Sequence, residues 1–267
     1  LKAAGRPGLI TFTMAGDPTP EIARDILLGL PQAGADIVEL GMPFSDPMAD
    51  GPAIQRAGQR AIAAGMTLEG VLDLARAFRQ RDNNTPLILM GYYNPIFHFG
   101  AEAFLAAATD AGVDGLIIVD LPPEEDAEFC LPALARGLAF IRLATPTTDE
   151  RRLGAVLKNT TGFLYYVSIT GITGAGSADP AAITPQIEAI RAKTDLPIAI
   201  GFGIKTPDQA AKFGAIGDAA VVGSAIVAEI DKALEAGLSA EDTTANVLTF
   251  VGSLAGGVRA ARPSSAA

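Results

Sequence analysis

The sequence predicts an α/β fold of the (β/α)8 TIM-barrel type, with residues 1–267 in a single domain. Eight short, apolar runs rich in β-forming residues recur along the chain, and amphipathic stretches of helical period lie between them. The runs are almost continuously apolar rather than alternating, which is typical of strands buried on both faces of a parallel sheet. Eight such units and a length of 267 residues both suit this barrel.

The eight expected strands are short and separated by turn residues. They lie at residues 9–14, 36–41, 87–92, 115–120, 139–144, 163–168, 197–202 and 219–224. A doubly wound open sheet is the structural alternative. We favour the barrel because an open sheet rarely needs eight such regular units, and because no G-x-G-x-x-G turn follows the first strand.

Stretches with helical periodicity follow the expected strands. Gly34 fits the C-cap of the first, Thr67 fits the N-cap of the third, and Pro132 is expected to kink or shorten the fifth. The expected helices lie at 20–34, 53–64, 67–81, 101–112, 124–137, 148–158, 179–193, 206–217, 223–237 and 240–255. The first residues and the tail at 258–267 are expected to be frayed.

Composition and charge exclude several classes of function. The net charge is −10 and the pI is near 4.6, so nucleic acid and anionic membrane surfaces are repelled. No apolar stretch approaches the roughly 18 residues that a membrane span needs. The single cysteine, Cys130, permits no internal disulfide and fits a reducing, cytoplasmic compartment. Because His98 is the only histidine, a metal site is not expected.

Two carboxylates, Glu39 and Asp50, lie in the second βα unit. In these barrels the catalytic residues lie at the C-terminal ends of the strands. Glu39 is near the end of an apolar strand, where poor solvation should raise its pKa and suit it to give and take a proton. Asp50 lies eleven positions further on, in a loop stiffened by prolines. Either residue could be structural instead, Glu39 as an ion-pair or capping partner and Asp50 as a turn or N-cap residue. Their presence on one rim favours catalysis.

Glycine-rich turns follow the last three expected strands, at 168–178, 201–203 and 223–225. Glycine lets backbone N–H groups approach an anion, and a helix N-terminus adds its dipole. Because barrels often bind phosphate after strands seven and eight, we predict a phosphate site here rather than tight turns alone. The segment TGITGAG within the first of these turns is either a lid over the substrate or simply disordered.

Several motifs together resemble the tryptophan synthase α subunit family. The longest is ELGMPFSDPMADGPAIQ at 39–55, and the similarity runs in register from about residue 9 to 228. The shorter motifs are AGDP at 15–18, GYYNP at 91–95, VDLPPEE at 119–125, TGITGA at 170–175 and GFGI at 201–204. From residue 229 onward the chain matches only as a generic helical end. The family's usual first helix, before strand one, is expected to be absent or shortened here.

The resemblance implies a lyase of L-tryptophan biosynthesis that cleaves indole-3-glycerol phosphate to indole and glyceraldehyde 3-phosphate by a retro-aldol reaction. It assigns the acid–base roles to Glu39 and Asp50. It implies that loops 43–50 and 169–183 close over the substrate. The implied phosphate-binding residues are Gly174, Gly203, Gly223 and Ser224, and the implied substrate-pocket residues are Phe12, Met90, Tyr92, Tyr165 and Thr173.

The resemblance also implies a partner, the pyridoxal-phosphate β subunit of tryptophan synthase, in an α2β2 heterotetramer in the cytoplasm. No cofactor and no metal are expected in this chain itself. Two other functions remain open from the residues alone. One is isomerisation of another sugar phosphate on the same barrel, and the other is a non-catalytic module that binds a phosphate ligand.

Overall fold

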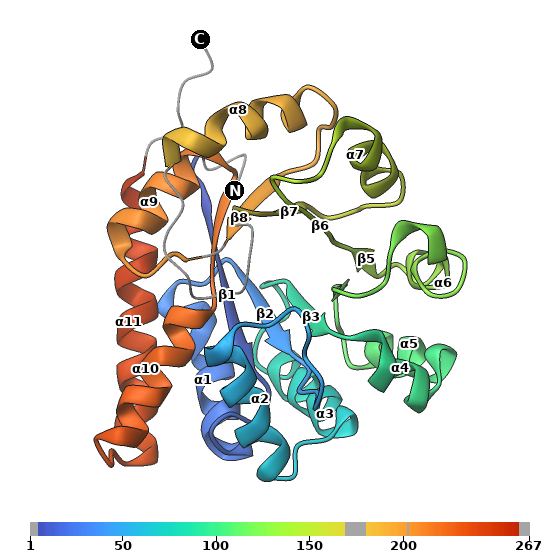
Figure 1. The fold of residues 1–267 in the computed structure, drawn as a ribbon. Helices are drawn as coiled ribbons and strands as arrows, with labels where there is room; N and C mark the ends of the chain where they lie inside the picture. Colours follow the sequence, from blue (N-terminus) through green and yellow to red (C-terminus); the bar gives the residue numbers. More distant parts are fainter. Residues whose placement is uncertain (1–4, 169–179, 202, 262–267) are drawn as a thin grey trace.

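Parallel strands form a nearly closed barrel with helices around it, which confirms the predicted TIM-barrel fold (Figure 1). The computed structural model describes residues 5–168, 180–201 and 203–261. In these ranges the strands are β1 (Gly8–Met14), β2 (Ile37–Gly41), β3 (Leu87–Gly91), β4 (Gly115–Ile118), β5 (Ala139–Phe140), β6 (Arg142–Ala144), β7 (Leu164–Val167), β8 (Ile198–Gly201) and β9 (Ala219–Val222).

The helices occupy the outside of this barrel (Figure 1). They are α1 (Pro20–Ala33), α2 (Pro52–Ala63), α3 (Leu68–Arg79), α4 (Tyr93–Phe99), α5 (Ala101–Asp110), the 3-10 helix η2 (Pro123–Glu125), α6 (Cys130–Ala135), α7 (Glu150–Leu157), α8 (Pro180–Arg191), α9 (Pro207–Ile216), α10 (Ser224–Glu235) and α11 (Ala240–Ala260). Two predicted caps are confirmed. Gly34 ends α1 in the left-handed conformation, and the Thr67 hydroxyl accepts a hydrogen bond from the Gly70 backbone N–H at the start of α3.

The predicted strand at 139–144 is present in two pieces, β5 and β6, on either side of Ile141. β5 pairs with β4 over two positions, and β6 pairs with β7 over three. The strand order is β5-β4-β3-β2-β1-β9-β8-β7-β6. The two ends of the order are thus joined by the chain at Ile141, and the nine strands of the described residues correspond to the eight predicted ones.

Strand side chains alternate between the barrel interior and the helix layer. Ile10, Ile88 and Tyr165 belong to a buried cluster inside the barrel, whereas Leu9 and Val38 belong to the larger cluster that the helices cover. Both sets are apolar. This two-sided burial is the physical reason why the strands are nearly continuous apolar runs in the sequence.

Two predicted helix boundaries differ from the structure, and one helix was not predicted. The helix predicted at 124–137 is reduced to η2 and α6, which confirms that Pro132 shortens it, because proline is tolerated only in the first turn of a helix. Helix α4 was not predicted. Helix α11 continues to Ala260, beyond the predicted end at 255, because the fully buried Val258 keeps it packed beside α9. The tail predicted to fray at 258–267 is therefore helical at its start; residues 1–4 and 262–267 lie outside the described ranges.

An ion-pair network joins the loop after β1 to helices α2 and α10. The buried Asp17 carboxylate accepts two hydrogen bonds from the Arg60 guanidinium, at 2.6 and 3.0 Å. Arg60 also pairs with Asp231 at 2.6 Å, and Arg56 pairs with Asp231 at 2.8 Å. Helix α2 follows the acidic loop and α10 follows the last glycine turn, so this network fixes the two helices that flank the predicted site.

We predict that Arg60→Gln lowers the free energy of unfolding by about 3 kcal/mol, because Asp17 then stays buried without its charged partner. Urea unfolding followed by circular dichroism measures the change. Arg24→Gln is the matched control: the Arg24–Asp25 pair is exposed, so its loss should cost no more than about 0.5 kcal/mol. Equal effects of the two substitutions would show that the network does not stabilise the fold.

Candidate active site

Glu39 is a buried carboxyl group at the centre of the candidate site. It lies on β2, is 0% exposed and lines the main cavity. Neither of its carboxyl oxygens has a hydrogen-bond partner in the described part of the chain. Burial raises the pKa of Glu39 from 4.5 to about 8, because removal from water penalises the charged form. Glu39 is therefore mostly protonated at neutral pH.

Two aromatic rings share the interior with Glu39. Phe12 of β1 is its register partner, and burial together with the Glu39 charge raises the pKa of Tyr165, whose hydroxyl stays protonated. Glycines provide the space for both rings. A Cβ atom at Gly41 would lie 2.6 Å from Phe12 Cζ, and one at Gly201 would lie 2.5 Å from the Tyr165 hydroxyl oxygen. A larger residue at either position would displace the ring.

Asp50 lies near the end of the loop between β2 and α2, directly before the N-cap residue Gly51, and is half-buried. Burial raises its pKa to about 6, and a hydrogen bond from the Tyr92 hydroxyl opposes the rise. The same hydroxyl accepts a hydrogen bond from the Ala49 backbone N–H at 3.0 Å, while the Tyr92 ring packs on Phe44 with 5.5 Å between centroids. Asp50 is therefore mostly ionised at neutral pH, in contrast to Glu39.

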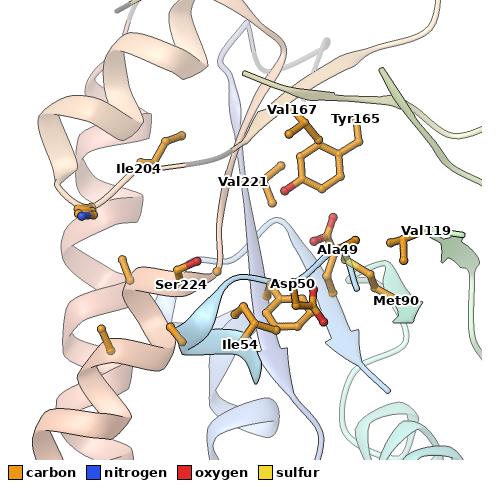
Figure 2. A pocket seen from close by; sticks show the side chains of 18 of the residues that line it. Ala49, Asp50, Ile54, Met90, Val119, Tyr165, Val167, Ile204, Val221 and Ser224 are labelled. Atoms are coloured by element: carbon orange, nitrogen blue, oxygen red, sulfur yellow. The ribbon is translucent and has the colours of Figure 1, made fainter. Parts of the chain in front are cut away.

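A cavity of about 930 Å³ at the C-terminal ends of the strands brings most of the predicted site residues together (Figure 2). Those that line it are Phe12, Glu39, Asp50, Met90, Tyr165, Gly203, Gly223 and Ser224. Tyr92 is not in this lining. It contacts Ala49 and Phe44 of the loop between β2 and α2 instead. Thr173 and Gly174 lie outside the described residues, as does most of the loop predicted at 169–183.

One side of this cavity is formed by a helix start and by glycine turns. Helix α10 begins at Ser224, and the first amides of a helix have no acceptor within it, so they remain available to a ligand. Gly203 has a φ of 77°, which glycine adopts without strain. In Figure 2, Ser224 lies on one side of the cavity, whereas Met90 and Val119 lie on the other. One end of the cavity thus offers backbone donors, and we propose it as the anion-binding end; the other end is apolar.

Several residues that line the cavity were not predicted from the sequence. They are apolar residues such as Ile54, Val119 and Leu143, and two cations, Lys205 and Lys232. Lys205 directly follows the GFGI motif, so its proximity to the glycine turn was visible in the sequence. Lys232 follows Ser224 by eight residues on the same helix, and only the packing of α10 shows that it reaches the cavity.

The described residues contain no group of three or more His, Cys, Asp or Glu side chains that could hold a metal ion. Nor does any helix in those ranges have the length and apolar character needed to cross a bilayer.

Comparisons with known proteins agree with this geometry. A family model described as "Tryptophan synthase alpha chain" matches residues 1–258. Tryptophan synthase subunit alpha from Legionella pneumophila str. Paris is 39% identical, with a TM-score of 0.89 over 97% of this chain and 95% of that chain. A structure from Aquifex aeolicus VF5 is 34% identical, with a TM-score of 0.86 over 97% and 96% of the respective chains. Tryptophan synthase from Mycobacterium tuberculosis is 31% identical, with a TM-score of 0.87 over 97% and 95%.

The family match covers nearly the whole chain, and the barrel, the buried acid and the glycine turns described above lie within it. This chain therefore belongs to the tryptophan synthase alpha chain family.

Proposed function

We propose that this chain cleaves indole-3-glycerol phosphate to indole and glyceraldehyde 3-phosphate, the α reaction of tryptophan synthase, with Glu39 and Asp50 as its catalytic residues. Its family makes it an enzyme of tryptophan biosynthesis, a carbon–carbon lyase. The observation that supports the assignment of residues is the buried Glu39 carboxyl group, which shares one cavity with Asp50 and with the N-terminus of α10.

Glu39 carries the proton transfers in this proposal. Its acid form, which prevails at neutral pH, donates a proton to indole C3. The hydroxyl on the adjacent side-chain carbon then gives its proton to the Glu39 carboxylate as the carbon–carbon bond breaks and the bonding electron pair returns to the ring. Indole leaves as a neutral molecule, the other fragment leaves as an aldehyde, and Glu39 is again protonated.

Asp50 stabilises the intermediate electrostatically. Protonation at C3 places positive charge on the indole ring, and an ionised Asp50 can accept a hydrogen bond from the ring N–H. Its pKa of about 6 keeps it ionised while Glu39 remains an acid. Two carboxyl groups in different environments thus take different roles.

The remaining lining residues orient the substrate in this proposal. Phe12, Met90 and Tyr165 bound the apolar end, where the indole ring would lie. The phosphate would lie at the other end, on Gly203, Gly223 and Ser224. Gly174 and Thr173, in the loop that would close over the substrate, are proposed members of the site on the family resemblance alone, as is Tyr92 as a pocket residue.

The family implies a complex with the β subunit. We propose an α2β2 heterotetramer in the cytoplasm, with pyridoxal phosphate on the β subunit only, because in this proposal Glu39 carries every proton transfer of the α reaction and Asp50 stabilises its intermediate. Light scattering on the mixed subunits measures the assembly. A mass that does not correspond to two copies of each chain would exclude this stoichiometry.

We predict that Glu39→Gln lowers kcat for indole release by about 10²–10⁴-fold, because glutamine cannot transfer the proton. Glu69→Gln, at an exposed position of α3, is the control and should leave kcat unchanged. Unchanged cleavage by Glu39→Gln would remove Glu39 from the mechanism. A folded wild-type chain that releases no indole would instead favour the sugar-phosphate isomerase or the binding module.

We also predict that the stability of Glu39→Gln relative to the wild type increases with pH. The wild type loses free energy of unfolding as the pH rises, and the glutamine variant has no such group to titrate. The folded wild type holds the Glu39 proton with a pKa of about 8, against 4.5 for the unperturbed group. The stability contributed by this protonated group is present below about pH 4.5 and is lost by on the order of 1.4 kcal/mol per pH unit until about pH 8. Urea unfolding of both proteins across this window measures the difference, and a difference that does not change with pH would contradict the prediction.

A further inference from the structure

In the ranges that the structure describes, some of the charged residues that line the cavity have no neighbour of opposite charge. The whole chain carries a net charge of −10, which opposes the approach of a phosphorylated ligand. At neutral pH Glu39 is mostly uncharged, and Lys232 pairs with Glu229 at 2.7 Å. Two charged residues of the described lining are left, Asp50 and Lys205.

Lys205 is held close to the anion-binding end of the cavity. It lies two residues after Gly203, and its backbone N–H donates a hydrogen bond to Gln209 Oε1 at 2.7 Å, which fixes the chain at the start of α9. Its neighbour Ile204 lies on the same side of the cavity as Ser224 in Figure 2. Lys205 is exposed, and among the described side chains it has no ion-pair partner.

We propose that Lys205 is a substrate-binding residue that attracts the phosphate end of the ligand and holds it beside the α10 N-terminus. The inference rests on the proposed function, because only an anionic substrate requires such a residue. Backbone amides act on a phosphate at contact distance, whereas an uncompensated charge acts over roughly the Debye length, about 8 Å at physiological ionic strength. Lys205 thus gives an acidic protein a local positive field at the mouth of its cavity.

Binding of the phosphate and transfer of the proton take place at different residues in this arrangement. Lys205 lies at the end of the cavity where the phosphate would bind, and the proton transfers occur at Glu39, which is buried inside the barrel. Loss of the Lys205 charge should therefore weaken binding of an anionic ligand without changing the rate of the bound complex. Lys232 should contribute less, because Glu229 already neutralises it.

The test compares Lys205→Gln with Lys212→Gln, which removes the same charge from an exposed position of α9 that does not line the cavity. We expect Lys205→Gln to raise KM for indole-3-glycerol phosphate by about three- to tenfold at low salt, with kcat unchanged. The inhibition constant of inorganic phosphate should rise by a similar factor. Both effects should shrink at high salt, and Lys212→Gln should show neither. Binding of indole, which has no charge, should be the same in all three proteins.

The inference is overturned if Lys205→Gln and Lys212→Gln have the same KM and the same phosphate inhibition constant, or if the difference between them does not depend on salt. Failure of the proposed function has a different signature, because wild-type protein would then release no indole. Calorimetric titration with inorganic phosphate would still compare the two variants in that case. Equal phosphate affinities would reject the role of Lys205, and a weaker affinity for Lys205→Gln would retain it.

Discussion

The site depends on the removal of one carboxyl group from water. Glu39 lies inside a barrel whose other interior residues are almost all apolar, and no side chain in the described ranges forms a hydrogen bond with it. A charged carboxylate is poorly stabilised there, so the group holds its proton at a pH where an exposed glutamate would have lost it. The apolar surroundings are unfavourable for the charged carboxylate, and for that reason Glu39 can act as an acid at neutral pH.

The second carboxyl group, that of Asp50, lies in a different environment and therefore has a different charge state. Asp50 lies on the loop that follows the same strand, but it is only half-buried and has the Tyr92 hydroxyl as a donor. Its ionised form is therefore better stabilised than that of Glu39. At the other end of the cavity, Gly203 and the α10 N-terminus offer backbone donors. A substrate with an aromatic ring at one end and a phosphate at the other fits this division of polarity.

The fold and the main part of the site were predictable because they depend on local signals. Apolar runs of strand length predicted the barrel, and its architecture places Glu39 and the glycine turns on one rim. The break at Ile141 and helix α4 were not predictable, since they depend on how neighbouring strands and loops meet. The contacts of Tyr92 with the loop between β2 and α2, and the reach of Lys232 into the cavity, likewise depend on packing between segments far apart in the sequence.

The division of the strand at Ile141 determines where the barrel is least rigid. Segments β5 and β6 make two and three ladder pairs, whereas β1 makes five with β2 and four with β9. β1, which carries Phe12, is also the middle strand of the order and lies farthest from the seam, and β2, which carries Glu39, lies beside it. Fluctuations cost least where few backbone hydrogen bonds must break. The barrel is thus least constrained at the seam, where Leu143 of β6 lines the cavity, and most constrained at β1 and β2, which carry Phe12 and Glu39.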